Sequence, residues 1–283
     1  MGIKMNQKVN EGSTAYQANG AMTVNNGMTF TEVRQLFEDL FERNFPRLVD
    51  AAAEKAQENL LKFYNEVASK LKEHEGTIDF GKFTNPNTQY LLSSTITDAA
   101  RTGNNLEFLS EALVTGLRSD SSEMLDIITE QALGLIPRLT NLHINTITLN
   151  QYIRNMRTLN IHDFSESAHK DTAVLKLLGE FNNISMGTIH YITSLGIASY
   201  INVVKYNEYE SVFKNHYPDL YGTKKENEIK TDIEIKSPSM KIMFDVFETK
   251  NVFQLTLNPV GQLIALINLK KVLGNLDYSI WIK

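Results

Sequence analysis

Apolar residues recur at helical spacing over most of this chain, and this repeat limits the fold to one built mainly from α-helices. The repeat begins after Thr29, which stands at capping-box spacing from Glu32. Pro46 is expected to kink or break the first helix, and a helical stripe then continues to about His74, before Gly76. The first helix carries apolar residues at the i, i+3, i+4, i+7 and i+8 positions of one face: Val33, Leu36, Phe37, Leu40 and Phe41.

Further helices are predicted along the chain as far as residue 215. Asp120 and Glu123 have the spacing of another capping box, and Pro137 separates two apolar segments. No internal period of roughly 20–50 residues occurs, so a solenoid is excluded. The predicted helical segments are 91–96, 106–117, 124–136, 139–159, 165–181, 184–195 and 199–215.

The pattern of residues 1–28 predicts a short β-meander at the N-terminus. Asn19-Gly20 and the run Asn25-Asn26-Gly27 divide β-tolerant segments, and Asn-Gly is a strong hairpin signal. Strands this short are not stable alone, so we expect the element to pair with other copies and to make the protein a homo-oligomer. Docking onto the protein's own helical body is the alternative. The expected oligomerisation residues are Ala15, Tyr16, Ala18, Met22 and Val24.

The end of the chain is expected to form a small α/β unit behind a linker. Residues 222–238 carry charges of both signs, have few large apolar side chains and end in Ser-Pro, which is typical of a linker. Residues 252–257 alternate like a strand, residues 259–273 start with proline as many helices do, and residues 276–282 alternate again. The predicted domains are therefore the β element 1–28, a helical domain 29–221, the linker 222–238 and a C-terminal strand–helix–strand unit 239–283.

The composition narrows the classes of function. The chain has 283 residues and no cysteine, which excludes disulfides, thiolate nucleophiles and cysteine-based metal sites. A net charge of -5 argues against general nucleic-acid binding, because duplex affinity rests on lysine and arginine neutralising phosphates. No apolar stretch follows Lys4 and Lys8, so no secretory signal is predicted. A cytoplasmic location is expected.

One pair of residues invites a catalytic interpretation. His162-Asp163, with His143 before it and Asp171 after it, can be compared with the metal-binding histidine–aspartate pair of phosphohydrolases. A metal site needs three or four converging ligands, and a helix cap at Asp163 or Ser165 explains the pair more simply. No phosphate-binding glycine loop, nucleophile elbow or His-Glu-x-x-His string occurs. We therefore assign no catalytic, metal or cofactor-binding residue.

Two apolar segments raise other functions. Residues 181–204 carry no Asp, Glu, Lys or Arg, but their many Asn, Thr and Ser residues disfavour a membrane-spanning helix. We expect a buried helix pair broken near Gly196 and no constitutive membrane span. The helix 259–273 has basic residues only at Lys270 and Lys271, in its last turn, whereas DNA-reading residues usually lie near the start of such a helix. DNA recognition is therefore not expected.

Five stretches together carry a family resemblance: residues 7–20 (QKVNEGSTAYQANG), 40–46 (LFERNFP), 131–140 (QALGLIPRLT), 257–265 (LNPVGQLIA) and 277–282 (DYSIWI). They resemble an uncharacterised bacterial protein family of LPO/Vpar type over nearly the whole chain. The first stretch is also similar to N-terminal segments of proteins suspected of roles in phage defence, and the helical region resembles abortive-infection proteins. The resemblance implies a setting and no site residues.

Three functions are open at this point. The leading hypothesis is a non-enzymatic interaction or effector protein that self-associates and acts on another bacterial or phage protein, in antiphage defence. One alternative is a metal-dependent hydrolase, a nuclease or phosphohydrolase, that uses His162 and Asp163. The other is a membrane-perturbing effector that uses residues 181–204.

Overall fold

The computed structural model describes residues 30–44, 50–119, 121–202 and 207–280. The fold is mainly α, as predicted, and these residues form thirteen α-helices and one two-stranded sheet. The α-helices in chain order are α1 Phe30–Asn44, α2 Asp50–Glu73, α3 Pro86–Thr102, α4 Leu106–Gly116, α5 Glu123–Leu135, α6 Asn141–Asn155, α7 Ala168–Leu178, α8 Met186–Ser194, α9 Glu208–His216, α10 Pro218–Tyr221, α11 Glu226–Lys236, α12 Pro238–Thr249 and α13 Pro259–Leu273.

Short 3₁₀-helices connect several of these elements. They begin or end where proline, glycine or a polar cap interrupts the α-helical repeat. Their bounds are η1 Glu75–Thr77, η2 Phe80–Thr84, η3 Ile136–Arg138, η4 Phe164–Ser167, η5 Phe181–Asn183, η6 Val252–Gln254 and η7 Tyr278–Ile280.

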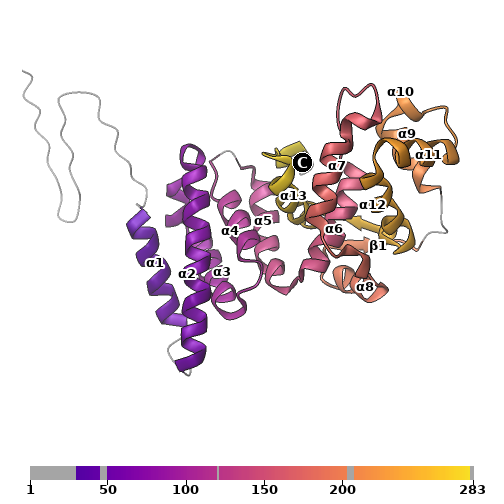
Figure 1. Cartoon of the computed structure of the whole chain (residues 1–283). Helices are drawn as coiled ribbons and strands as arrows, with labels where there is room; N and C mark the ends of the chain where they lie inside the picture. Colours follow the sequence, from indigo (N-terminus) through magenta and orange to yellow (C-terminus); the bar gives the residue numbers. More distant parts are fainter. Residues whose placement is uncertain (1–29, 45–49, 120, 203–206, 281–283) are drawn as a thin grey trace, which may run out of the picture.

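Helix α13 lies between two groups of helices. Figure 1 shows α1 to α5 on one side of it and α6 to α12 on the other. α13 packs against α4 and α5 from the first group and against α6 and α7 from the second. A helix that is apolar all round is buried on all sides, and every residue from 260 to 269 is buried except the half-buried Gln262. This helix therefore joins the two groups into one hydrophobic core.

Local signals set the ends of α13 where the sequence predicts them. The side chain of Asn258 caps the helix by accepting a hydrogen bond from the backbone N of Gly261 at 3.0 Å. Pro259 is the first helical residue, where its missing N–H costs nothing. Gly274 follows the last residue with a φ of 81°, a conformation that glycine adopts easily.

Some predicted boundary signals fall where the structure gives no description. Thr29 and Pro46 lie outside the described residues, and so does Asp120. Ser122 caps α5 by accepting a hydrogen bond from the backbone N of Leu125 at 3.2 Å. Ser122 therefore has the helix-capping role that the sequence suggested for Asp120.

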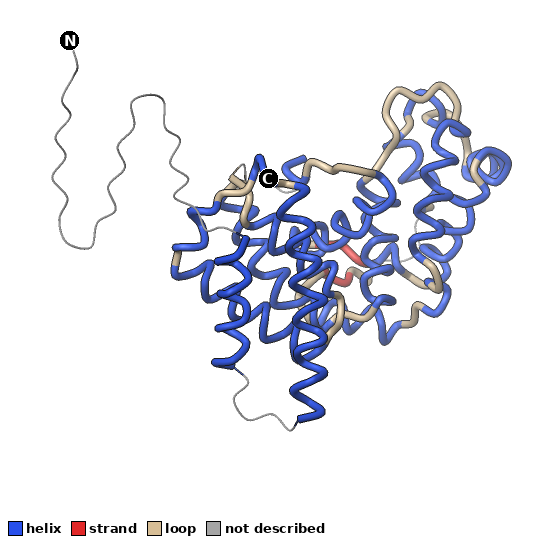
Figure 2. The backbone as a smooth tube through the Cα atoms, turned by 60° about the vertical axis from the view of Figure 1, so that its left-hand side comes forward, coloured by secondary structure: helices blue, strands red, loops and turns tan. Residues whose placement is uncertain are grey.

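The sheet pairs two segments that are distant in the chain. β1 (Ala198–Tyr200) and β2 (Leu255–Leu257) run antiparallel, with Ser199 opposite Thr256. Figure 2 shows both strands enclosed by helices. The predicted helix 199–215 is therefore wrong at its start, because its first residues pair with β2 and the helix begins only at α9. The predicted strand 252–257 is half correct, since η6 replaces its first three residues.

Residues 222–238, predicted to be a linker, contain a packed helix. α11 contacts α9 and α12, and Ile229 and Ile233 are fully buried. These two isoleucines are four residues apart and lie on one face of a helix. The many charged residues around them are half-buried or exposed, which is why the composition resembled that of a linker.

The predicted strand 276–282 is also wrong in its described part. Residues 278–280 form η7. Tyr278 is 5% exposed, so it packs into the core without belonging to a sheet. Alternation of apolar and polar residues produces a strand only where a partner strand is available, and no described strand pairs with residues 276–280. The sequence predicted a strand, a helix and a second strand at the C-terminus. The structure has the strand β2, the helix α13 and the 3₁₀-helix η7.

The predicted β-meander lies outside the described residues. This holds for the whole range 1–28 and for all of its expected oligomerisation residues. The β-meander and the self-association that we assigned to it stay predictions.

Candidate functional site

His162 and Asp163 directly precede η4, and Asp163 is its N-cap. Asp163 accepts a hydrogen bond from the backbone N of Ser165 at 2.9 Å and pairs with Lys236 at 2.5 Å. Glu166 in turn accepts from the backbone N of His162 and of Asp163, at 2.9 Å each. The predicted cap at Asp163 is confirmed. The hydrogen bond from Lys236 holds the pKa of Asp163 well below its usual range, and the His162 side chain is exposed.

The other residues of the suspected metal site have separate environments. His143 lies in the first turn of α6, where its Nδ1 accepts from the backbone N of Thr140 at 3.1 Å in a capping box. Asp171 is buried in the first turn of α7. Across the described residues, no group of three or more His, Asp or Glu side chains could hold a metal ion.

Asp171 is a buried carboxyl held by three hydroxyl groups. It accepts hydrogen bonds from Tyr152 at 2.6 Å, from Ser237 at 2.7 Å and from Ser167 at 2.9 Å. Burial raises its pKa, although the three hydrogen bonds act in the opposite direction. The donors come from α6, from the cap of α12 and from η4, so this carboxyl joins three elements around α7.

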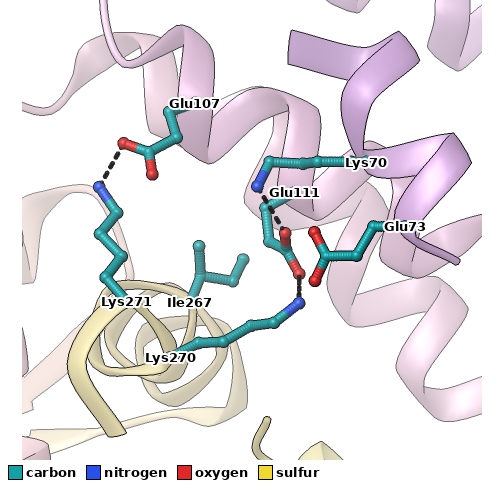
Figure 3. A pocket seen from close by; sticks show the side chains of 7 residues that line it. All are labelled: Lys70, Glu73, Glu107, Glu111, Ile267, Lys270 and Lys271. Atoms are coloured by element: carbon teal, nitrogen blue, oxygen red, sulfur yellow. Dashed lines mark hydrogen bonds and ion pairs between the residues drawn. The ribbon is translucent and has the colours of Figure 1, made fainter. Parts of the chain in front are cut away.

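A charged pocket of about 190 Å³ lies where α2, α4 and α13 meet (Figure 3). At its centre Glu111 stands between two lysines, Lys70 at 2.9 Å and Lys270 at 2.7 Å. Lys271 pairs with Glu107 at 2.6 Å near the rim. The residues that line the pocket are Lys70, Glu73, Glu107, Glu111, Ile267, Lys270 and Lys271.

The two lysines decide the charge state of Glu111. Burial acts to raise its pKa, but the hydrogen bonds from Lys270 and Lys70 outweigh burial and lower it. His74 lies 3.3 Å from the ammonium of Lys270, and burial together with this positive charge lowers the pKa of the imidazole. The carboxylate is therefore ionised and the histidine neutral near pH 7.

The charged pocket holds helices together and leaves none of its lysines unpaired for an anionic ligand. Each of its three lysines has a carboxylate partner within the pocket. From the sequence, Lys270 and Lys271 are known only as the basic residues in the last turn of their helix. The structure adds that both reach α4, which no local pattern could indicate because the partners are more than 150 residues away.

An apolar groove lies between α1 and α2, and we call it the α1–α2 groove. It has a volume of about 230 Å³. Phe37 and Leu60 are buried beneath it, whereas the side chain of Leu61 is 60% exposed. Arg34 and Glu38 form an ion pair at its rim, with a distance of 2.9 Å. An exposed leucine beside buried aromatic residues provides an apolar contact surface.

The described part of the charge-free segment 181–204, residues 181–202, forms several short elements. η5, α8 and β1 follow one another, so the predicted helix pair is wrong in its second member. Isoleucines at positions 184, 189, 192 and 197 are buried, whereas uncharged polar residues between them, such as Asn182, Asn183 and His190, are exposed. In the part of the chain that the structure describes, we find no helix with the length and apolar character needed to cross a membrane.

Comparison with known proteins gives one family. A family model described as ":-like" matches residues 27–226 and, in a second segment, residues 221–282. The chain belongs to this family. No curated protein and no solved structure matches the chain.

The family match covers every site described above. Its first segment contains α1 to α10, and its second contains α11 to α13. The charged pocket takes Glu111 from the first segment and Lys270 from the second. The two matched segments therefore fold against each other through α13.

Proposed function

We propose that this protein is a non-enzymatic interaction protein that self-associates, with residues 1–28 of one copy binding the α1–α2 groove of a second copy. The observation that carries the proposal is the groove itself. It offers an exposed apolar side chain, Leu61, beside a buried aromatic floor. Burying such a surface against another chain is favourable, at about 25 cal/mol per Å² of apolar area.

The N-terminal segment has a composition that suits this groove. Residues 12–31 contain no Asp, Glu, Lys or Arg, so binding would not remove a charge from water. Their apolar side chains include Tyr16 and Met22, which are large enough to fill a groove of about 230 Å³. Ala15, Ala18 and Val24 add smaller contacts.

A second copy suits this segment better than the helical body of its own chain. The groove can cover one or two large side chains, and the remaining backbone N–H and C=O groups need other partners. A short strand satisfies them most readily by pairing with the same strand of a neighbour, which is how exposed strand edges associate. A symmetric pair would then place one segment in each groove.

The proposal is tested by the mass of the protein in solution. Light scattering at micromolar concentration should give an oligomer for the full chain and a monomer after deletion of residues 1–28. Leu61→Asp should also give a monomer, because it places a charge in the groove. Leu159→Asp is the matched control, since Leu159 is 66% exposed in the loop after α6. A full chain that is already monomeric, or a deletion that keeps the full oligomer, rejects the proposal.

Antiphage defence, a cytoplasmic location and a bacterial or phage protein as partner stay predictions that rest on the composition and the resemblance. They are tested by isolating the tagged protein from its native host before and after phage infection. A partner that is retained by the full chain and lost with Leu61→Asp would link the partner to the oligomer.

A further inference from the structure

A second, polar pocket lies between α6, α9, β2 and α13. It has a volume of about 260 Å³. This is below the size of pockets that hold drug-sized molecules and suits a small metabolite. Its walls combine both matched family segments, since Asn150 and Glu208 belong to the first and Gln262 to the second. The pocket shares no residue with the α1–α2 groove or the charged pocket.

Asn150 lines this pocket and has an unused acceptor. The residue is 1% exposed. Its Nδ2 donates to the backbone O of Val252 at 2.9 Å and of Leu255 at 3.0 Å, which fixes the orientation of the amide. Its Oδ1 is buried and has no hydrogen-bond partner among the described residues. A buried acceptor without a donor is costly, and a ligand that donates a hydrogen bond to it would remove that cost.

Two opposite charges line the same pocket without pairing with each other. Arg154 donates from its Nη2 to the backbone O of Phe253, while its Nε is buried and has no partner in the described part of the chain. Glu208 is 8% exposed, and its charge attracts that of Arg154 at a longer range than a salt bridge. Burial lowers the pKa of Arg154 and raises that of Glu208, so both charged forms lack solvation.

We propose that this pocket binds a small zwitterion of the α-amino-acid type, with its carboxylate at Arg154 and its ammonium group at Glu208 and Asn150. The carboxylate would accept from the free Nε of Arg154. The ammonium group would donate to the Glu208 carboxylate and to the unused Oδ1 of Asn150. Both charges and the buried acceptor are then satisfied by one molecule.

Ligands with a single kind of charge fit this arrangement less well. A phosphate or a simple carboxylate would meet Arg154 but would also be repelled by Glu208. A simple amine would meet Glu208 and leave the guanidinium of Arg154 buried without an acceptor for its Nε. A molecule that carries an ammonium group and a carboxylate on the same carbon atom matches both groups.

The full chain can be tested with three probes by isothermal titration calorimetry. L-alanine carries both charges, whereas propionate lacks the ammonium group and isopropylamine lacks the carboxylate. L-glutamine and the other standard amino acids test how large a side chain the pocket admits. We expect at least one amino acid to bind and both single-charge analogues to bind about tenfold more weakly or worse. The proposal is overturned if no amino acid binds, or if propionate or isopropylamine binds as tightly as the best amino acid.

One matched pair of variants locates the binding. Glu208→Gln keeps the shape of the side chain and removes its charge, so binding should weaken about ten- to a hundredfold. Glu234→Gln makes the same change at an exposed position of α11 and should leave binding unchanged. Equal affinity of the unmodified protein and of Glu208→Gln for the amino acid would reject the proposed binding site. If Glu208→Gln does not fold, as circular dichroism would show, the comparison of the three probes on the unmodified protein still decides.

Discussion

Lys270 donates a hydrogen bond of 2.7 Å to Glu111, although 159 residues separate them in the chain. Glu111 also pairs with Lys70, so one carboxylate connects α2, α4 and α13. The Glu111 side chain is 7% exposed and each lysine side chain is 15% exposed. Ion pairs this well buried are sensitive to the loss of one partner, because the remaining charge is left without compensation.

We therefore expect Glu111→Gln to destabilise the protein strongly. Two buried ammonium groups would lose their carboxylate, and losses of this kind cost about 3–5 kcal/mol. Urea unfolding followed by circular dichroism measures the difference. Glu58→Gln is the control: Glu58 pairs with Lys55 and Lys62 on the exposed face of α2, where screening by water makes ion pairs weak. Equal unfolding midpoints for the two variants would contradict the assigned role of Glu111.

Two glycines in helices should respond to alanine in opposite directions. A Cβ on Gly261 in α13 would lie 2.6 Å from the backbone O of Ile197, so Gly261→Ala should destabilise by about 1–3 kcal/mol. A Cβ on Gly134 in α5 would meet nothing within 4 Å. Gly134→Ala should therefore stabilise by about 0.5–1 kcal/mol, the usual gain of alanine over glycine in a helix. Thermal unfolding of both variants checks the sign of each change.

Asp171 should make stability depend on pH in the acidic range. Its pKa in the folded protein is raised above the ordinary value of 3.8, so the folded state binds more protons than the unfolded state above that pH. Stability contributed by this group therefore falls as the pH rises from about 3.8 through the raised pKa. Asp171→Asn should remove this dependence. The free energy of unfolding is measured for the unmodified protein and for Asp171→Asn between pH 4 and pH 7, at roughly one-unit steps. Parallel curves for the two proteins would contradict the predicted role of Asp171.

His162 and Asp163 should be dispensable for function but unequal in their effect on folding. Asp163→Ala removes the cap of η4 and the ion pair with Lys236, so a lower melting temperature is expected. His162→Ala leaves those contacts intact, because His162 contributes only its backbone N to Glu166. Neither variant should change a cellular phenotype. Loss of activity with unchanged folding, together with stoichiometric metal in the purified protein, would favour the hydrolase instead.

The sequence predicted the elements whose signals are local. Capping residues, proline and glycine act within one turn of a helix end, so the bounds of α13 and the cap at Asp163 could be inferred from neighbouring residues alone. The periodic apolar stripes of α1 and α2 were visible for the same reason, since each face is defined within a few residues. The absence of charge between residues 181 and 204 predicted burial only in part, because the isoleucines at 184, 189, 192 and 197 are buried whereas many residues between them are exposed.

Tertiary structure alone decided the elements and sites that depend on distant partners. β1 exists because residues 198–200 pair with a strand more than 50 residues later, although their own sequence favoured a helix. α11 was hidden because its buried face contains only Ile229 and Ile233 among charged neighbours. Asn150 contacts carbonyl groups more than 100 residues away, and the polar pocket around it has no sequence signature. The local spacing of apolar residues determines which segments form helices. The packing of segments that are distant in the chain determines which polar groups come together.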